Sequence, residues 1–137
     1  MNTVVESVFL AAVATLPALA EINQRTGVSA EENPPDTAAI IVNCPDCEHT
    51  VGPLWKATIV FRLETPAYNY DRSDHDARFN ALRAWLADKA AVTAAVQMNG
   101  MGLGGYFVQH SRTSIEDKRW VAEIEIVAGA VDTSAGA

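Results

Sequence analysis

The chain has 137 residues and a mass of 14.7 kDa, enough for one compact domain that needs no disulfide or metal to fold. Hydrophobic residues make up 49% and charged residues 20% of the sequence, which excludes a disordered or fibrous protein. Ten basic against seventeen acidic residues give a net charge of −7. That sign argues against non-specific binding to nucleic acid or to anionic membranes.

The apolar N-terminal segment has features of both a helix and a secretory signal. Residues 8–20 (VFLAAVATLPALA) end in Ala-Leu-Ala, but no Lys or Arg precedes Arg25, so the basic region of a signal is missing. We therefore expect this segment to be a helix of the mature protein. In a cytoplasmic protein, Cys44 and Cys47 would be free thiols.

The first helix is bounded by recognisable residues. Thr3 and Glu6 match a capping box, which predicts that the helix begins at Val4. Pro17 cannot donate a backbone hydrogen bond, so the helix should kink or restart there. An apolar face could continue to about Gln24.

The middle of the chain predicts two strands separated by loops. Residues 26–36 are polar and rich in Pro, which is typical of a loop. Residues 37–43 (TAAIIVN) are typical of a short buried strand, and 44–53 of a second loop. Residues 55–64 alternate apolar and polar side chains, which predicts a long strand with one buried face.

The second half of the chain predicts one or two helices and two strands. Ser73 is a suitable N-cap, and apolar residues then recur at helical spacing. Residues 91–98 either continue this helix or form a second one. A strand beginning at Tyr106 should lead through a turn at 112–118 into a last alternating strand at 119–128.

Together these elements predict a single α+β domain over residues 1–130, followed by a flexible tail at 131–137. In the order helix, strand, strand, helix, strand, strand, a mostly antiparallel sheet of about four strands carries two main helices on one face. The polar sides of the two long strands have opposite charges, which favours their pairing. These residues are Lys56 and Arg62 on the first strand, and Glu123 and Glu125 on the last.

The motif Cys44-Pro45-Asp46-Cys47 could bind zinc or act as a redox dithiol, with His49 as a further ligand. No second Cys pair completes a four-ligand zinc site. Gly52 and Pro53 prevent the helix that would activate a redox pair. We therefore expect two reduced thiols in a loop, and keep a metal site of Cys44, Cys47 and His49 as the minor alternative.

No pattern in the sequence points to catalysis. The glycines of residues 100–105 follow a helix and open a strand, which is the reverse of a dinucleotide-binding loop. His75 lies between Asp74 and Asp76, but adjacent helical residues point apart, so we interpret all three as solvated capping residues. We expect no enzymatic activity and no cofactor.

Two segments are candidates for contacts with other molecules. Tyr68, Tyr70 and Arg72 share one loop, and exposed Tyr with Arg is typical of protein interfaces, although both rings could instead fold back onto the domain. A second segment is acidic and is either an interaction surface or an ordinary solvated loop. It contains Glu31, Glu32, Asp36, Asp46 and Glu48 and no basic residue.

Four segments between about Val4 and Val127 form a further pattern. They are SVFLAAVATLPAL, GPLWKATIVFRLET, SDHDARFNALRAWL and QHSRTSIEDKRWVAEIEI. In these segments and in the order of elements, the chain resembles the tail-terminator (minor tail) proteins of long-tailed phages and prophages. The Cys44-x-x-Cys47 motif is not a feature of that family.

The resemblance implies a small α/β subunit of the virion, made in the host cytoplasm and placed at the head-proximal end of the tail. Such subunits assemble as a ring, commonly a hexamer, that caps the tail tube and presents a docking surface to the head or neck connector. The implied partners are therefore other copies of the chain, the tail tube protein and the connector. DNA only passes through the lumen, and no membrane, cofactor or catalytic residue is implied.

A lumen through which DNA slides should repel phosphate. The residues that we expect to line it are Glu31, Glu32, Asp36, Glu123 and Glu125. Two alternatives stay open: a head-to-tail connector or tail-completion protein, and, from another class, a small cytoplasmic metal-binding or redox domain using Cys44 and Cys47.

Overall fold

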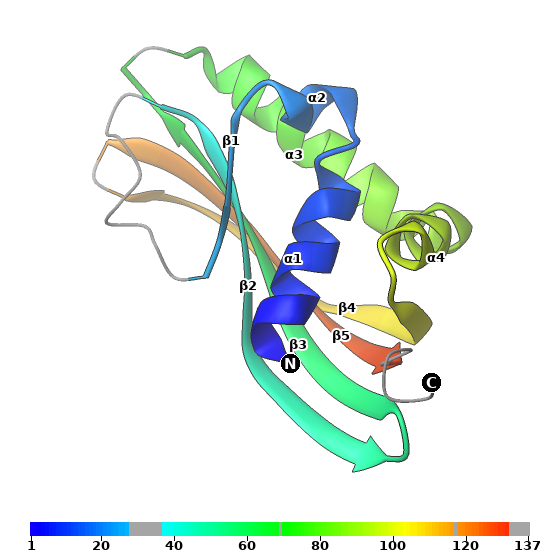
Figure 1. Cartoon of the computed structure of the whole chain (residues 1–137). Helices are drawn as coiled ribbons and strands as arrows, with labels where there is room; N and C mark the ends of the chain where they lie inside the picture. The colour runs from blue at the N-terminus through cyan, green and yellow to red at the C-terminus, as the bar shows by residue number, and fades with distance from the viewer. Residues whose placement is uncertain (28–36, 69, 117, 132–137) are drawn as a thin grey trace.

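The computed structural model describes residues 1–27, 37–68, 70–116 and 118–131. Within these ranges the chain forms four helices and a five-stranded sheet with the strand order β1-β2-β3-β5-β4 (Figure 1). The helices are α1 (Asn2–Val13), α2 (Pro17–Ala20), α3 (Arg72–Ala87) and α4 (Lys89–Met98). The strands are β1 (Asn23–Thr26), β2 (Ala39–Val51), β3 (Leu54–Pro66), β4 (Gly102–Glu116) and β5 (Arg119–Val131).

The sheet is antiparallel except at one edge, where the short strand β1 runs parallel to β2. The helices lie on one face of the sheet (Figure 1). The expected single α+β domain with a mostly antiparallel sheet is therefore confirmed. The sheet has five strands where the sequence predicted about four.

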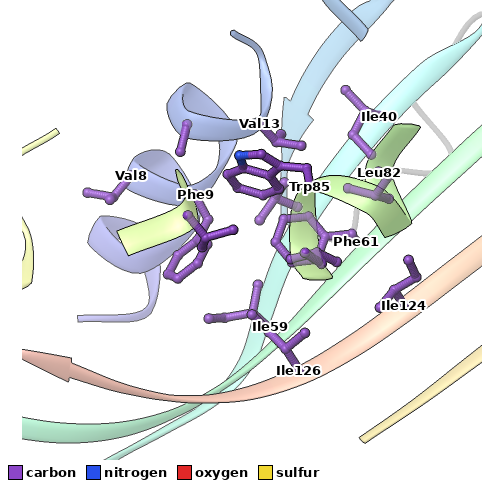
Figure 2. Close-up of a cluster of buried hydrophobic side chains, with 14 of the residues drawn as sticks. Val8, Phe9, Val13, Ile40, Ile59, Phe61, Leu82, Trp85, Ile124 and Ile126 are labelled. Carbon is purple, nitrogen blue, oxygen red and sulfur yellow. The ribbon is translucent and has the colours of Figure 1, made fainter. Parts of the chain in front are cut away.

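The core lies between the helices and the central strands β3 and β5. Ile59, Phe61, Ile124 and Ile126 alternate along these strands with residues of the opposite face, which are mostly polar, and point toward the helices, as the sequence predicted (Figure 2). The Phe61 ring meets two aromatic rings edge to face, Phe9 of α1 at 6.1 Å and Trp85 of α3 at 6.3 Å between ring centroids. This packing fixes both helices on the sheet.

The N-terminal helical segment is interrupted, as expected, at Pro17, where α2 restarts the helix for four residues. The apolar face does not continue to Gln24, because the polar residues Asn23–Thr26 form β1 and pair with Ala39–Val42 of β2. Four polar residues give no periodic signal, so only the partner strand reveals this element. No helix in the described ranges is long and apolar enough to cross a membrane.

Two segments predicted as a loop and a turn are strand. β2 continues through residues 44–51, and β4 continues through residues 112–116. In both, the neighbouring strand supplies the backbone hydrogen bonds, although the register shifts between Asn43 and Asp46 and again between Val108 and His110. Pairing decides the conformation here, because these mostly polar and exposed residues have no apolar alternation to mark a strand.

The glycine run after α4 has a structural explanation. Gly100 has a φ of +88°, and its N–H donates to the Gln97 carbonyl while that of Met101 donates to Val96, which is a Schellman ending of the helix. Gly102 begins β4, where a Cβ atom would lie 2.9 Å from the Cβ of Val131. The run thus connects a helix to a strand, as predicted.

Glu6 does not form the predicted capping box, because α1 begins at Asn2 and has no side-chain cap. The Glu6 carboxylate is buried and accepts a hydrogen bond of 2.7 Å from the backbone N–H of Cys44. Asn2, one turn earlier, donates to the Cys44 carbonyl at 2.8 Å. Two side chains of α1 thus hold both backbone groups of one β2 residue.

Replacing Glu6 by Ala should lower the free energy of unfolding by about 1–3 kcal/mol, because the buried N–H of Cys44 loses its acceptor. Chemical denaturation measures the change. Glu21→Ala removes an exposed carboxylate and is the control, with an expected change within about 0.5 kcal/mol. Equal losses in the two variants would contradict this role of Glu6.

Candidate assembly surfaces

Strand β4 lies at one end of the sheet and pairs only with β5 among the described residues. Its first residues are held by helices, since Lys89 Nζ donates to the Tyr106 carbonyl at 2.5 Å and the Tyr106 hydroxyl donates to the Leu86 carbonyl at 2.6 Å. From Phe107 onward, no described strand or helix pairs with the side of β4 that faces away from β5. We call residues 107–116 the β4 edge.

The side chains of the β4 edge are mostly exposed, including apolar ones. Ile115 is 68% exposed and Phe107 is 58% exposed, and Val108 is also exposed. A long unpaired edge with apolar side chains is a site where another strand can add. The sequence did not predict it, although β-branched and aromatic residues in this stretch were a signal for a strand.

The second half of β2 forms a similar edge at the other side of the sheet. β1 pairs with β2 only over Ala39–Val42, and two side chains of α1 then hydrogen-bond to the backbone of Cys44. Beyond Pro45 no described residue pairs with this side of the strand. We call residues 46–51 the β2 edge; its last residue, Val51, is 70% exposed.

The two thiols lie on β2 and not in a loop. Cys44 comes just before the β2 edge, and Cys47 lies within it. Cys44 is buried in the core, and its Sγ contacts the Asp46 carbonyl at 3.5 Å. His49 Nε2 is 2.6 Å from the Gly52 carbonyl, and its ring packs on Trp55. Among the described residues, no group of three or more His, Cys, Asp or Glu side chains is placed to hold a metal ion.

Burial, and after it the nearby Cys47 and Glu6, raise the pKa of the Cys44 thiol to about 12. Burial also raises the pKa of Cys47, which is less deeply buried. Because the thiolate is the reactive form, both thiols should be poor nucleophiles at neutral pH. This is the opposite of the activation that a redox pair requires.

In the native protein, iodoacetamide should therefore modify Cys47 slowly and Cys44 more slowly still. After unfolding, both thiols should react at the normal rate of an exposed cysteine. Intact mass after timed labelling measures this. Cys47→Ala should remove the faster native reaction, and Cys44→Ala should leave it. A Cys44 that reacts first in the folded chain would contradict the expected order.

A network of ion pairs lies on the face of the sheet opposite the helices. Arg62 of β3 donates to Glu123 at 2.5 Å, to Glu116 at 2.7 Å and to Glu64 at 3.3 Å. Arg112 donates to Glu123 at 3.1 Å, and Arg119 lies 3.7 Å from Glu64. Arg62 and Glu123 are directly opposite in register, which confirms the predicted charge attraction for this pair, whereas Lys56 lies opposite Gly129 and Glu125 opposite Val60.

The network bears on the residues expected to line a lumen. Burial alone would raise the pKa of Glu123, but hydrogen bonds from Arg112 and Arg62 bring it below its usual value, so this carboxylate is ionised and paired. Glu125 lies beside it on β5, opposite Val60 and His110 in register. The other three candidates, Glu31, Glu32 and Asp36, lie outside the described residues.

The loop after β3 separates its two tyrosines. Tyr68 is 84% exposed, as an interface residue would be. Tyr70 packs against the core, and the Arg78 guanidinium lies 5.6 Å from its ring centroid. Arg72 is exposed at the first turn of α3. Tyr68 thus fits the interface interpretation of this loop, and Tyr70 fits the alternative in which the ring folds back onto the domain.

A hollow of about 250 Å³ lies between the start of α3 and β4. Its lining includes His75, which is buried and shares a hydrogen bond of 2.7 Å with the Thr65 hydroxyl through Nδ1. The interpretation of His75 as a solvated residue is therefore wrong. Ile115 and Trp120 also line this hollow, which adjoins the β4 edge.

A scan against models of known protein families finds no match for the chain, and a search of curated proteins finds none.

Proposed function

We propose that this chain is a structural virion protein that resembles a tail terminator: it assembles into a ring that caps the tail tube and presents a docking surface to the head or neck connector. The observation that supports this proposal is a pair of sheet edges, the β4 edge and the β2 edge, which lie at opposite sides of one small domain and pair with none of the described strands on their outer sides. Two different complementary edges on one subunit are what a closed ring requires.

The charges of the chain suit a ring through which DNA passes. A lumen that binds phosphate tightly would retain the DNA. The chain has seven more acidic than basic residues, and Arg62 at the centre of the ion-pair network is bound to three carboxylates of the same chain. In this proposal the lumen is lined by Glu31, Glu32 and Asp36, or by the face that carries Glu123 and Glu125.

The test is the mass and shape of the purified protein, by multi-angle light scattering and negative-stain imaging. The expected result is an annulus whose mass is a multiple of 14.7 kDa. A particle of 14.7 kDa at high concentration, unchanged by added tail tube protein, would contradict the proposal. Replacing Glu31, Glu32 and Asp36 by Lys should leave the ring intact and hinder DNA passage, which infectivity measures.

A further inference from the structure

We infer that neighbouring copies of this chain associate by antiparallel strand pairing, the β4 edge of one copy adding to the β2 edge of the next. This contact rests on the proposed ring and specifies the surfaces that form it. Each edge has backbone N–H and C=O groups that form no hydrogen bond with a described residue, and the two edges lie at opposite sides of the sheet. Pairing two such edges would satisfy both and remove the aggregation risk that an open edge creates.

The strand directions within the chain fit this contact. Each neighbouring pair in the series β2, β3, β5 and β4 is antiparallel, so β4 runs opposite to β2. Rotation about a ring axis that runs roughly along the strands leaves every strand direction unchanged. The β2 edge of the next copy therefore meets the β4 edge in the antiparallel sense, which continues the sheet from copy to copy.

The charges on the two edges favour pairing between unlike edges. The β2 edge carries two exposed carboxylates, Asp46 and Glu48. The middle of the β4 edge carries Arg112, whose side chain stays 50% exposed although it donates to Glu123. Opposite charges across a strand pair stabilise it.

The same charges disfavour a two-fold contact between like edges. Two β4 edges would bring Arg112 of each copy together, and two β2 edges would bring four carboxylates together. A two-fold contact would also close after two copies and leave the other edges unused. A second copy in head-to-tail arrangement is therefore the occupant that both edges fit.

Apolar side chains add to the complementarity of the contact. Val51 on the β2 edge and Val108 and Ile115 on the β4 edge are large, apolar and exposed in the single chain. In a strand-addition contact the main-chain hydrogen bonds give affinity, and the burial of such side chains between the strands adds to it.

Cross-linking of mixed single-cysteine variants tests the contact in the full chain. In a Cys44→Ala, Cys47→Ala background shown to assemble like the native protein, Glu48→Cys is placed on the β2 edge and Thr113→Cys on the β4 edge. A short bismaleimide should join two chains when the two variants are mixed and should give little product with either alone. Efficient cross-linking of Thr113→Cys with itself would indicate a two-fold β4 contact and overturn the inference.

A second set of variants measures assembly directly. Ile115→Lys places a charge on the β4 edge and should raise the concentration needed for assembly by about tenfold or more, since edge lysines block strand addition. Met98→Lys is the matched control, because it also replaces an exposed apolar side chain by Lys, at a residue of α4 that is 87% exposed. Tyr68→Lys tests the other candidate surface.

The outcomes separate this inference from the proposed function. A ring that resists Ile115→Lys and is lost with Tyr68→Lys would overturn the edge contact and leave the ring proposal standing. A native chain that stays at 14.7 kDa throughout would overturn both.

Discussion

Replacing Phe61 by Ala should lower the free energy of unfolding by about 3–5 kcal/mol. Phe61 is fully buried at the centre of the sheet, where its ring touches the rings of Phe9 and Trp85. The substitution removes a large apolar surface and leaves a cavity between α1, α3 and β3. Because a domain of this size is stable by about 5–15 kcal/mol, this loss is a large share of the total stability.

Phe107→Ala is the matched control, because it makes the same change on the β4 edge at a side chain that is 58% exposed. Its expected effect on the unfolding of the single chain is below about 1 kcal/mol. Urea denaturation followed by tryptophan fluorescence measures both variants. Similar losses for Phe61 and Phe107 would mean that the aromatic cluster is not the centre of the core.

Replacing Arg62 by Met should destabilise the fold by about 2–3 kcal/mol, because it leaves three carboxylates close together without their shared cation. The Arg62 side chain is only 23% exposed and lies between Glu64, Glu116 and Glu123. Lys56→Met is the control on the same strand and the same face, at an exposed residue. Its expected effect is within about 0.5 kcal/mol.

The same network predicts how stability depends on pH. The pKa of Glu123 in the folded chain lies below its ordinary value of 4.5, so its pairing stabilises the fold above that pH. This contribution is lost as the pH falls through the lower, folded-state pKa. Arg62→Met removes one of the two hydrogen bonds that lower the pKa, so the variant should lose less stability on acidification than the native chain. Parallel acid curves for the two proteins would contradict the role of the network.

The candidate surfaces differ in how far the sequence could predict them. The sequence marked Tyr68 and Tyr70 as interface candidates but could not separate them, since both are aromatic residues of one polar loop and only Tyr70 packs against the core. The β4 edge was predicted in part as a turn, because its side chains are exposed and give no alternation. The sequence misplaced Glu6 for a related reason: its spacing from Thr3 fits a capping box, but its hydrogen-bond partner, Cys44, is far away in the chain.

By itself, the sequence determined the α+β class, the two long central strands, the restart at Pro17 and the attraction between Arg62 and Glu123. Each depends on a period of two, a period of 3.6 or a local constraint, which short stretches of chain contain. Only the tertiary structure decided β1, the full lengths of β2 and β4, the buried states of Glu6 and His75, and the two edges that no described strand pairs with. Those features depend on which segments become neighbours, because strand pairing and the burial of a polar side chain are set by the partner.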